Sequence, residues 1–368
     1  MRSSLHTIAR RRLVNQHLVA PALAGAVDVV RRLGAVQAQD YGAAKWAIAQ
    51  RTKGRLRDAQ VEDAFATGAI LRTHVLRPTW HFILPGDARW MLELTAPRIG
   101  AAMAHYNRQL ELDATVFRKS HAALVRALRD GQHRTRAELQ AALARAGVNV
   151  SSGQRAGNLL MQAELDGVII SGPRRGKQFT YALFDERVPA APSRDREEAL
   201  DDLTRRYFAT RGPATVQDLA WWSGLTVADA QRGVEIAGAS IVREQIDGRA
   251  YWSTRDGTGT VRRWTRIAHL LSNYDEYFIG FHDRSAFGER LRAARPAAHV
   301  DVLMGHLLSL DGQIVGGWRR TLGATVHVDL QLLVRLPTPE RALARRAGRR
   351  FGVFLGLPVR VREHRRSR

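Results

Sequence analysis

The chain has 368 residues and no cysteine, and its 57 basic residues outnumber 35 acidic ones to give a formal net charge of +22. The lack of cysteine excludes disulfide bonds, thiolate zinc sites and cysteine nucleophiles. We find neither a signal peptide nor the ~20-residue apolar run of a membrane span, so we expect a soluble, cytoplasmic protein. The positive charge, part of which coding bias towards arginine would explain, favours a polyanion such as nucleic acid as partner.

The first 114 residues combine helical periodicity with a hairpin pattern. Apolar spacing predicts helices over residues 8–18 and 26–39, followed by two shorter helices that end before Gly68. Residues 70–74 and 79–84 then read as strands around the turn Val75–Pro78. Helices followed by a β-hairpin are the element order of a winged helix-turn-helix unit. Two long helices, at about 86–96 and 97–112, are expected to lead away from it.

The same order is expected twice more. Residues 115–193 contain three helical patterns, one with a capping box at Thr135 and Glu138, and then a hairpin with the basic tip Arg174-Arg175-Gly176-Lys177. Residues 194–255 again contain three helical patterns and a hairpin, with its turn at Asp247-Gly248. We therefore predict three winged helix-turn-helix units in tandem.

The remaining residues, 256–368, are mostly predicted strands. Residues 302–310, 313–319 and 327–336 alternate apolar and polar side chains, and a helix over 339–355 precedes a last strand. We interpret this part as a small β-barrel or curled sheet closed by one helix. The predicted fold class is thus α+β, with three winged units followed by a β-barrel.

The segment Gly34–Tyr41 contains the most informative polar residues. The sequence has no dinucleotide-binding or phosphate-binding glycine loop and no metalloprotease motif, and its histidines lack ligand spacing. Gln37 and Gln39 lie two residues apart, so in an extended chain both amides point to one side and together can hold a water molecule. Alternatively, they are surface residues that end a helix.

Four segments resemble the AlkZ/YcaQ-like winged-helix DNA glycosylase family. They are Leu33–Asp40, Leu76–Phe82, Tyr274–Gly280 with the following Asp283-Arg284, and Asp311–Arg319. The first is similar to the family's catalytic QxQ/QxD segment and the second to its first hairpin. The match runs in order from about residue 8 to 363. Because the QxQ form is present, the chain looks closest to the AlkZ branch, which is associated with self-resistance to azinomycin-type crosslinkers.

The resemblance implies a C-shaped enzyme that curves around double-stranded DNA and excises N7-alkylated guanine, including guanine in interstrand crosslinks. It implies no metal and no other cofactor. Gln37 and Gln39 would orient the attacking water at C1′. Gln39 replaces a carboxylate of some relatives and cannot act as an ordinary general base. Asp40 is a lesser candidate for that role, and we expect a monomer.

Further residues are expected to contact DNA or to support the fold. On the two hairpins, we expect DNA contacts from Arg77, Thr79, His81, Arg174, Arg175 and Lys177, with solvated surface as the alternative. Asp275, Glu276, Arg284 and Arg319 are expected to form an ion-pair network rather than to catalyse. The alternative function is a non-catalytic winged-helix DNA-binding protein, such as a transcription regulator. A metal-dependent nuclease is disfavoured, because the acidic residues are not clustered.

Overall fold

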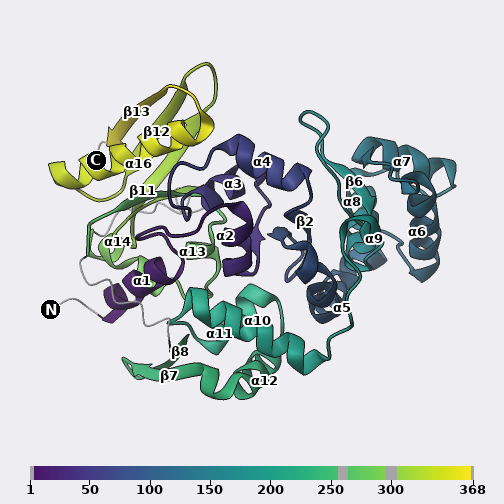
Figure 1. Ribbon diagram of the computed structural model, residues 1–368, viewed down its shortest axis with the longest axis horizontal. Coiled ribbons are helices and arrows are strands. Elements are labelled where there is room, and N and C mark those ends of the chain that lie inside the picture. The colour runs from purple at the N-terminus through teal and green to yellow at the C-terminus, as the bar shows by residue number, and fades with distance from the viewer. Residues whose placement is uncertain (1–3, 256–263, 295–304, 366–368) are drawn as a thin grey trace.

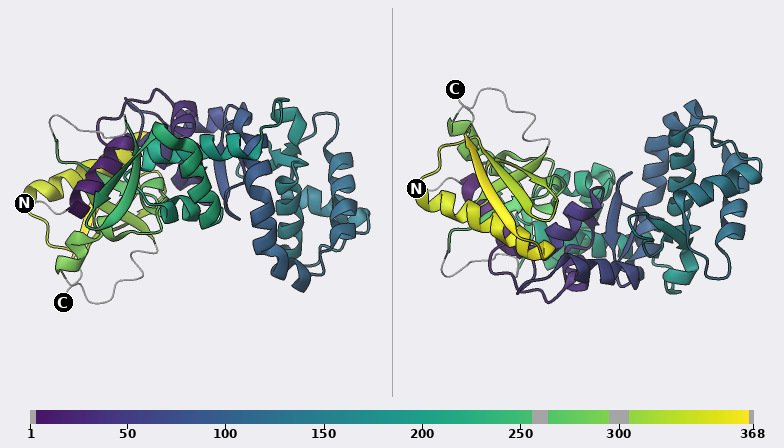
Figure 2. Two further views of the ribbon diagram at one scale, coloured as in Figure 1. Left: turned by 90° about the horizontal axis from the view of Figure 1, so that it is seen from below. Right: turned by 90° about the horizontal axis from the view of Figure 1, so that it is seen from above.

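The computed structural model describes residues 4–255, 264–294 and 305–365 as a mixed α+β protein. Among these residues, no helix is long and apolar enough to cross a membrane. The first unit sits at the centre of Figure 1, with the second unit on one side of it and the C-terminal sheet on the other. In the right-hand view of Figure 2 the two ends turn to the same side, which gives the molecule a curved outline.

The first unit follows a lone N-terminal helix, α1 (Ser4–Asn15). Its helices and strands are α2 (Ala26–Leu33), β1 (Val36–Gln37), α3 (Tyr41–Ala49), α4 (Asp58–Ala66), β2 (Leu71–His74) and β3 (Trp80–Ile83). The strands form a sheet of order β1-β3-β2, in which both pairs are antiparallel. The predicted hairpin over residues 70–84 is confirmed.

The second unit repeats this element order. It consists of α6 (Ala114–Leu128), β4 (Arg134–Thr135), α7 (Arg136–Arg145), α8 (Gly153–Leu165), β5 (Ile169–Ser171) and β6 (Thr180–Leu183), followed by the short helix α9 (Phe184–Arg187). Its sheet order, β4-β6-β5, matches that of the first unit. The predicted capping box is confirmed, since Thr135 Oγ1 accepts from the backbone N–H of Glu138. A hydrophobic core of its own holds this unit together.

The third unit has the same order with a shorter first strand. It consists of α10 (Arg196–Arg211), α11 (Val216–Ser223), α12 (Val227–Ala237), β7 (Ile241–Ile246) and β8 (Arg249–Thr254). A single bridge between Ala214 and Trp252 takes the place of the first strand. In all three units, a strand or bridge before the second helix pairs with the last strand of the unit.

One helix, α5 (Pro85–Gln109), joins the first two units. The prediction of two helices that meet at residue 97 was wrong, because α5 continues through Pro97. Proline removes one backbone hydrogen-bond donor, but this 25-residue helix keeps its hydrogen-bonded turns on both sides of Pro97.

The C-terminal part contains an open sheet instead of the predicted barrel. Five strands have the order β13-β12-β11-β10-β9, and only β12 and β13 are parallel. They are β9 (Ala268–Leu271), β10 (His306–Leu310), β11 (Gln313–Thr321), β12 (Val326–Leu332) and β13 (Val359–Arg365), and the helices here are α13 (Glu276–Ile279), α14 (Glu289–Ala294) and α16 (Thr338–Leu355). Among the described residues no pair closes β9 onto β13. One face of the sheet is already buried against α16 and α3, so closure is not needed to cover it.

Candidate functional site

The segment with the two glutamines is extended, not helical. The predicted helix over residues 26–39 ends at Leu33, because Gly34 adopts φ +78°, which interrupts the helical path. Val36 and Gln37 pair with Phe82 and His81 of β3, and the Ala38 N–H donates to Trp80 O at 2.7 Å. Gln37 lies in β1 and Gln39 in the bend that follows, and their side chains bond to two groups of the same hairpin, Arg77 and the Trp80 N–H.

Both glutamine amides are held through their oxygen atoms. Gln37 is only 5% exposed, and its Oε1 accepts a 2.8 Å hydrogen bond from Arg77 Nη2. Gln39 is exposed, and its Oε1 accepts a long 3.4 Å hydrogen bond from the Trp80 N–H. An amide oxygen has two lone pairs, so each of these oxygens can accept one further hydrogen bond, for example from a water molecule.

Arg77 lies inside the first hairpin rather than on its surface. Its guanidinium holds Gln37 and lies 5.6 Å from the centroid of the Trp221 ring. Burial lowers the pKa of Arg77, and the carboxylate of Glu276 works against that change. The hairpin turn is pressed against the end of α11, where a Cβ on Gly224 would lie 2.0 Å from Leu76 O. Glycine at this position therefore allows the third unit to support the hairpin that carries Arg77.

Thr79 and His81 carry polar atoms that have no hydrogen-bond partner among the described residues. Thr79 is half-buried, and its Oγ1 has no partner. His81 is fully buried, so its ring presents no surface to DNA in this conformation. Its Nδ1 lies 2.9 Å from Thr79 O, whereas its Nε2 has no partner. Burial, reinforced by the nearby Arg77 charge, holds the pKa of His81 well below its usual range, so the ring is neutral at physiological pH.

Asp40 has a structural task that the sequence analysis did not identify. Its carboxylate accepts a 3.0 Å hydrogen bond from the Ala43 N–H and thereby caps α3. It also lies 3.6 Å from Arg320 Nη2. This hydrogen bond to the start of α3 is a sufficient reason for aspartate at the position.

Glu276 is the site residue whose role sequence reasoning missed. Its Oε1 accepts the Gln37 N–H at 2.8 Å, and its Oε2 accepts from Arg211 at 2.6 Å and from Trp222 Nε1 at 2.9 Å. Arg211 also donates to Leu33 O at 3.0 Å. The only sequence signal was the similarity of Tyr274–Gly280 to a family segment, which did not indicate a contact across 239 positions.

The ion-pair network predicted for Asp275, Glu276, Arg284 and Arg319 forms only in part. Asp275 and Glu276 do form buried ion pairs, but their partners are Arg51 and Arg211. Arg284 instead donates to the backbone oxygen of Phe278 at 3.3 Å. Arg319 is exposed.

At the basic tip of the second hairpin, two arginines form ion pairs within the protein and the lysine is exposed to solvent. Arg174 pairs with Glu62 at 3.2 Å and lies over the rings of Tyr41 and Phe179, so it links the second unit to the first. Arg175 is exposed but pairs with Glu138 at 2.8 Å. Lys177 is exposed at the tip.

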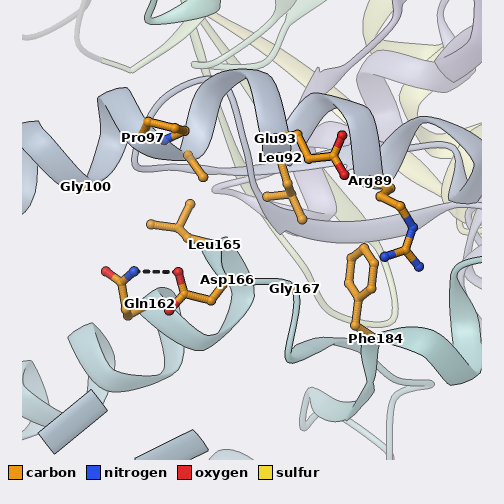
Figure 3. Close-up of a pocket in the computed structure, with 11 residues that line it drawn as sticks. Arg89, Leu92, Glu93, Pro97, Gly100, Gln162, Leu165, Asp166, Gly167 and Phe184 are labelled. Atoms are coloured by element: carbon orange, nitrogen blue, oxygen red, sulfur yellow. Dashed lines mark hydrogen bonds between the residues drawn. The ribbon is translucent and has the colours of Figure 1, made fainter. Parts of the chain in front are cut away.

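A separate cleft of about 410 Å³ lies between α5 and the second unit. Figure 3 shows Leu92 and Pro97 of α5 facing Leu165, with Phe184 and Arg89 near one another at one end. The residues that line the cleft do not include Gln37, Gln39 or any other predicted site residue.

Comparison with known proteins agrees with the resemblance noted in the sequence. A family model described as "DNA glycosylase AlkZ-like" matches residues 30–354. An "Interstrand DNA cross-link repair glycosylase" from Streptomyces sahachiroi is 25% identical over 364 residues, which cover 93% of each chain. The solved structure of "Streptomyces sahachiroi DNA glycosylase AlkZ" has the same fold, with a TM-score of 0.78 and 22% identity over 98% of this chain and 100% of that one. The chain therefore belongs to the AlkZ-like DNA glycosylase family.

Proposed function

We propose that this protein hydrolyses the N-glycosidic bond of N7-alkylated guanine in double-stranded DNA and also unhooks interstrand crosslinks formed through N7. The observation that carries the proposal is that Gln37 and Gln39 both bond to the first hairpin through an amide oxygen that can still accept a hydrogen bond from water. The crosslink substrate is supported by the similarity to the interstrand DNA cross-link repair glycosylase of Streptomyces sahachiroi. The biological role would be DNA repair and self-resistance.

The reaction needs little acid or base catalysis from the protein. Alkylation at N7 makes the base cationic, so the bond from C1′ to N9 breaks with its electron pair on the base, which leaves as a neutral molecule. A water molecule then bonds to C1′ of the oxocarbenium-like sugar and releases a proton to solvent. No general acid is needed for this leaving group. The protein must orient the water, and preorganised polar groups do so without reorganising during the reaction.

In this mechanism the two amide oxygens accept the two hydrogens of the water. That arrangement directs a lone pair of the water oxygen towards the sugar. Arg77 keeps the Gln37 oxygen in place, and the Trp80 N–H does the same for Gln39. Neither amide takes up the proton, because an amide is too weak a base.

We further infer that the three repeated units are winged helix-turn-helix units that follow the curved outline along DNA. Each has the element order expected of that motif, with its first strand or bridge paired to its last strand. On this basis Thr79, Arg175 and Lys177 contact the DNA backbone. Arg77 bonds to Gln37, Arg174 pairs with Glu62, and His81 is buried. These three residues therefore support the DNA-facing surface from inside the protein. The enzyme would act as a monomer at the nucleoid.

The test is release of 7-methylguanine from alkylated duplex DNA, beside an authentic N7-guanine crosslink, in a chelator-containing buffer. We expect wild type to release the base. A Gln37→Ala/Gln39→Ala variant should lose at least ~10²-fold in rate while it still binds DNA, by analogy with removal of one orienting group from an active site. Gln162→Ala, which removes a glutamine from the separate cleft, is the matched control and should leave the rate unchanged.

The same experiment distinguishes the non-catalytic alternative. A transcription regulator would bind the DNA and create no abasic site. Binding without base release from any N7 adduct would therefore overturn the enzyme proposal.

A further inference from the structure

The backbone of the glutamine segment is held by a buried ion pair from distant parts of the chain. Glu276 and Arg211 have side chains that are 0% exposed, and their charged atoms lie 2.6 Å apart. Arg211 donates to Leu33 O at 3.0 Å and to Ala35 O at 3.4 Å, and Glu276 accepts from Gln37 N at 2.8 Å. Arg211 and Glu276 thus bond to the backbone at three positions: Leu33, Ala35 and Gln37.

The hydrogen bond from Gln37 N to Glu276 satisfies a backbone donor of strand β1 that has no partner in a neighbouring strand. This strand lies at the edge of its sheet, so only one of its sides has a neighbouring strand. The N–H of Gln37 points away from β3 into the protein, where a buried donor without a partner is costly. A carboxylate is a strong acceptor for such a donor, because the hydrogen bond is assisted by charge. Trp222 Nε1 and Arg211 bond to the other oxygen and so fix the plane of the carboxylate.

We propose that Glu276 is a positioning residue for base excision, which acts through Gln37 and does not touch the substrate. This inference rests on the proposed function. Gln37 is held at both ends: Glu276 fixes its backbone nitrogen, and Arg77 fixes its side-chain oxygen. With both ends fixed, the free lone pair of the amide oxygen keeps one direction. A misplacement of about 1 Å in such a group lowers the rate by ~10²-fold.

Asp275 supplies a matched control within the same turn. It is also 0% exposed and pairs with a buried arginine, Arg51, at 2.7 Å. Arg51 in turn bonds to Gln16 and to Ala47 O. None of these contacts reaches the segment from Leu33 to Asp40. Asp275 also caps α13 through the Tyr277 N–H, and asparagine can do the same, so Asp275→Asn removes a buried charge but keeps the cap and the contact from Glu276 to Gln37.

The substitution that tests the proposal is Glu276→Gln. The new side chain has the same shape, but one of its two ends is a donor. Whichever way it is turned, an NH₂ group faces either the Gln37 N–H or the donors of Arg211 and Trp222. The alignment of Gln37 is therefore disturbed with little change in volume.

The measurement is single-turnover release of 7-methylguanine, together with the dissociation constant for the same duplex and a thermal unfolding curve. For Glu276→Gln we expect a ~10²-fold slower release and an unchanged dissociation constant. Asp275→Asn should lower the unfolding temperature by a similar amount but keep the wild-type release rate. In the Gln37→Ala background, Glu276→Gln should slow release no further, because both changes act through one group.

Three outcomes would overturn the inference. The first is a Glu276→Gln release rate equal to that of Asp275→Asn. The second is a raised dissociation constant for Glu276→Gln that accounts for its slower release. The third is a double variant in which the rate losses of Gln37→Ala and Glu276→Gln multiply. If wild type itself releases no base, the proposed function fails and this inference with it. Wild-type activity with an unaffected Glu276→Gln variant overturns the inference alone.

A second variant keeps the proposal testable if Glu276→Gln does not fold. Arg211→Lys retains the charge next to Glu276, but an ammonium group cannot reach Glu276, Leu33 O and Ala35 O at once as the guanidinium does. We expect the same slow release with unchanged DNA affinity. A wild-type rate in a folded Arg211→Lys protein would overturn the proposal.

Discussion

The first and second units have the same element order, but their first strands lead into the next helix differently. In the second unit the last strand residue, Thr135, is itself the N-cap of α7 and shares a capping box with Glu138. In the first unit β1 ends at Gln37, and Ala38, Gln39 and Asp40 follow before α3 begins. Asp40, not a strand residue, provides the cap.

This difference explains how one copy of a repeated unit acquires a chemical site. In the second unit the hydroxyl of Thr135, the last strand residue, caps the helix through the Glu138 N–H. In the first unit Asp40 caps the helix, so the amides of Gln37 and Gln39 bond to Arg77 and the Trp80 N–H and can take the proposed role in the reaction. The third unit follows the second, because Thr215 caps α11 directly after the bridging Ala214.

The largest effect is expected from the arginine of the first hairpin. Arg77→Ala leaves Gln37 Oε1 without its donor, and we expect single-turnover base release to fall by ~10²-fold. Arg175→Ala, in the corresponding hairpin of the second unit, should leave the release rate at saturating enzyme unchanged. Equal rate losses in the two variants would mean that the hairpins do not differ as described.

The capping box of the second unit should affect stability alone. Thr135→Ala removes the acceptor for the Glu138 N–H, and we expect a loss of ~1 kcal/mol in the free energy of unfolding. Urea unfolding curves measure this change. Base release below the melting range should stay at the wild-type rate, and a slower rate would indicate that the second unit takes part in the chemistry.

Lys177 at the tip of the second hairpin should contribute to DNA affinity and not to the reaction. Loss of one phosphate contact should lower the slope of log affinity against log salt concentration by ~1 in Lys177→Ala. Binding measured over a range of salt concentrations gives this slope. An unchanged slope would place the tip away from DNA.

Acidification should weaken the first unit through His81. Gln37, His81 and Thr73 face one another across the three strands of its sheet. The pKa of His81 is held well below 6.5 by burial, so at pH values below 6.5 the unfolded chain binds a proton that the folded chain does not. Stability is therefore lost as the pH falls through this range. Urea unfolding at pH 7.5 and 5.5 should show a smaller loss for His81→Asn than for wild type, and an equal loss would contradict the assignment.

The smallest effect is expected at Asp40. Asparagine is as good an N-cap as aspartate, so Asp40→Asn should keep both stability and release rate near wild type. A general base could not survive this substitution. A strong loss of activity at unchanged stability would therefore assign Asp40 a general-base role that the proposed mechanism does not include.

Local sequence signals predicted the parts of the fold that depend on local interactions. The first hairpin, the capping box at Thr135 and the turn at Asp247-Gly248 are all present, because short-range hydrogen bonding and backbone preference determine them. The helix predicted through residue 39 was wrong, because Gly34 and the pairing with β3 outweigh its apolar spacing. The barrel was wrong because α16 and α3 cover the face of the sheet that closure would otherwise have buried.

The site was only partly accessible from sequence for a similar reason. Gln37 and Gln39 were predicted from their spacing and from family resemblance, and their catalytic role stays a prediction. Arg77 was expected to contact DNA, which stays a prediction, and the structure adds a bond to Gln37 that the sequence did not indicate. Glu276 could not be connected to Gln37, because no periodicity or motif spans 239 positions.

The bond from Gln37 N to Glu276 has a consequence for the order in which the protein is made. The glutamine segment leaves the ribosome early, whereas the residue that secures it is 239 positions further along. At ~5–20 residues per second, translation separates the two by roughly 10–50 s. Until then the N-terminal part lacks one of the two anchors of Gln37. A chain that ends before Glu276 lacks this hydrogen bond, so under the proposed mechanism it should release bases slowly until most of the polypeptide exists.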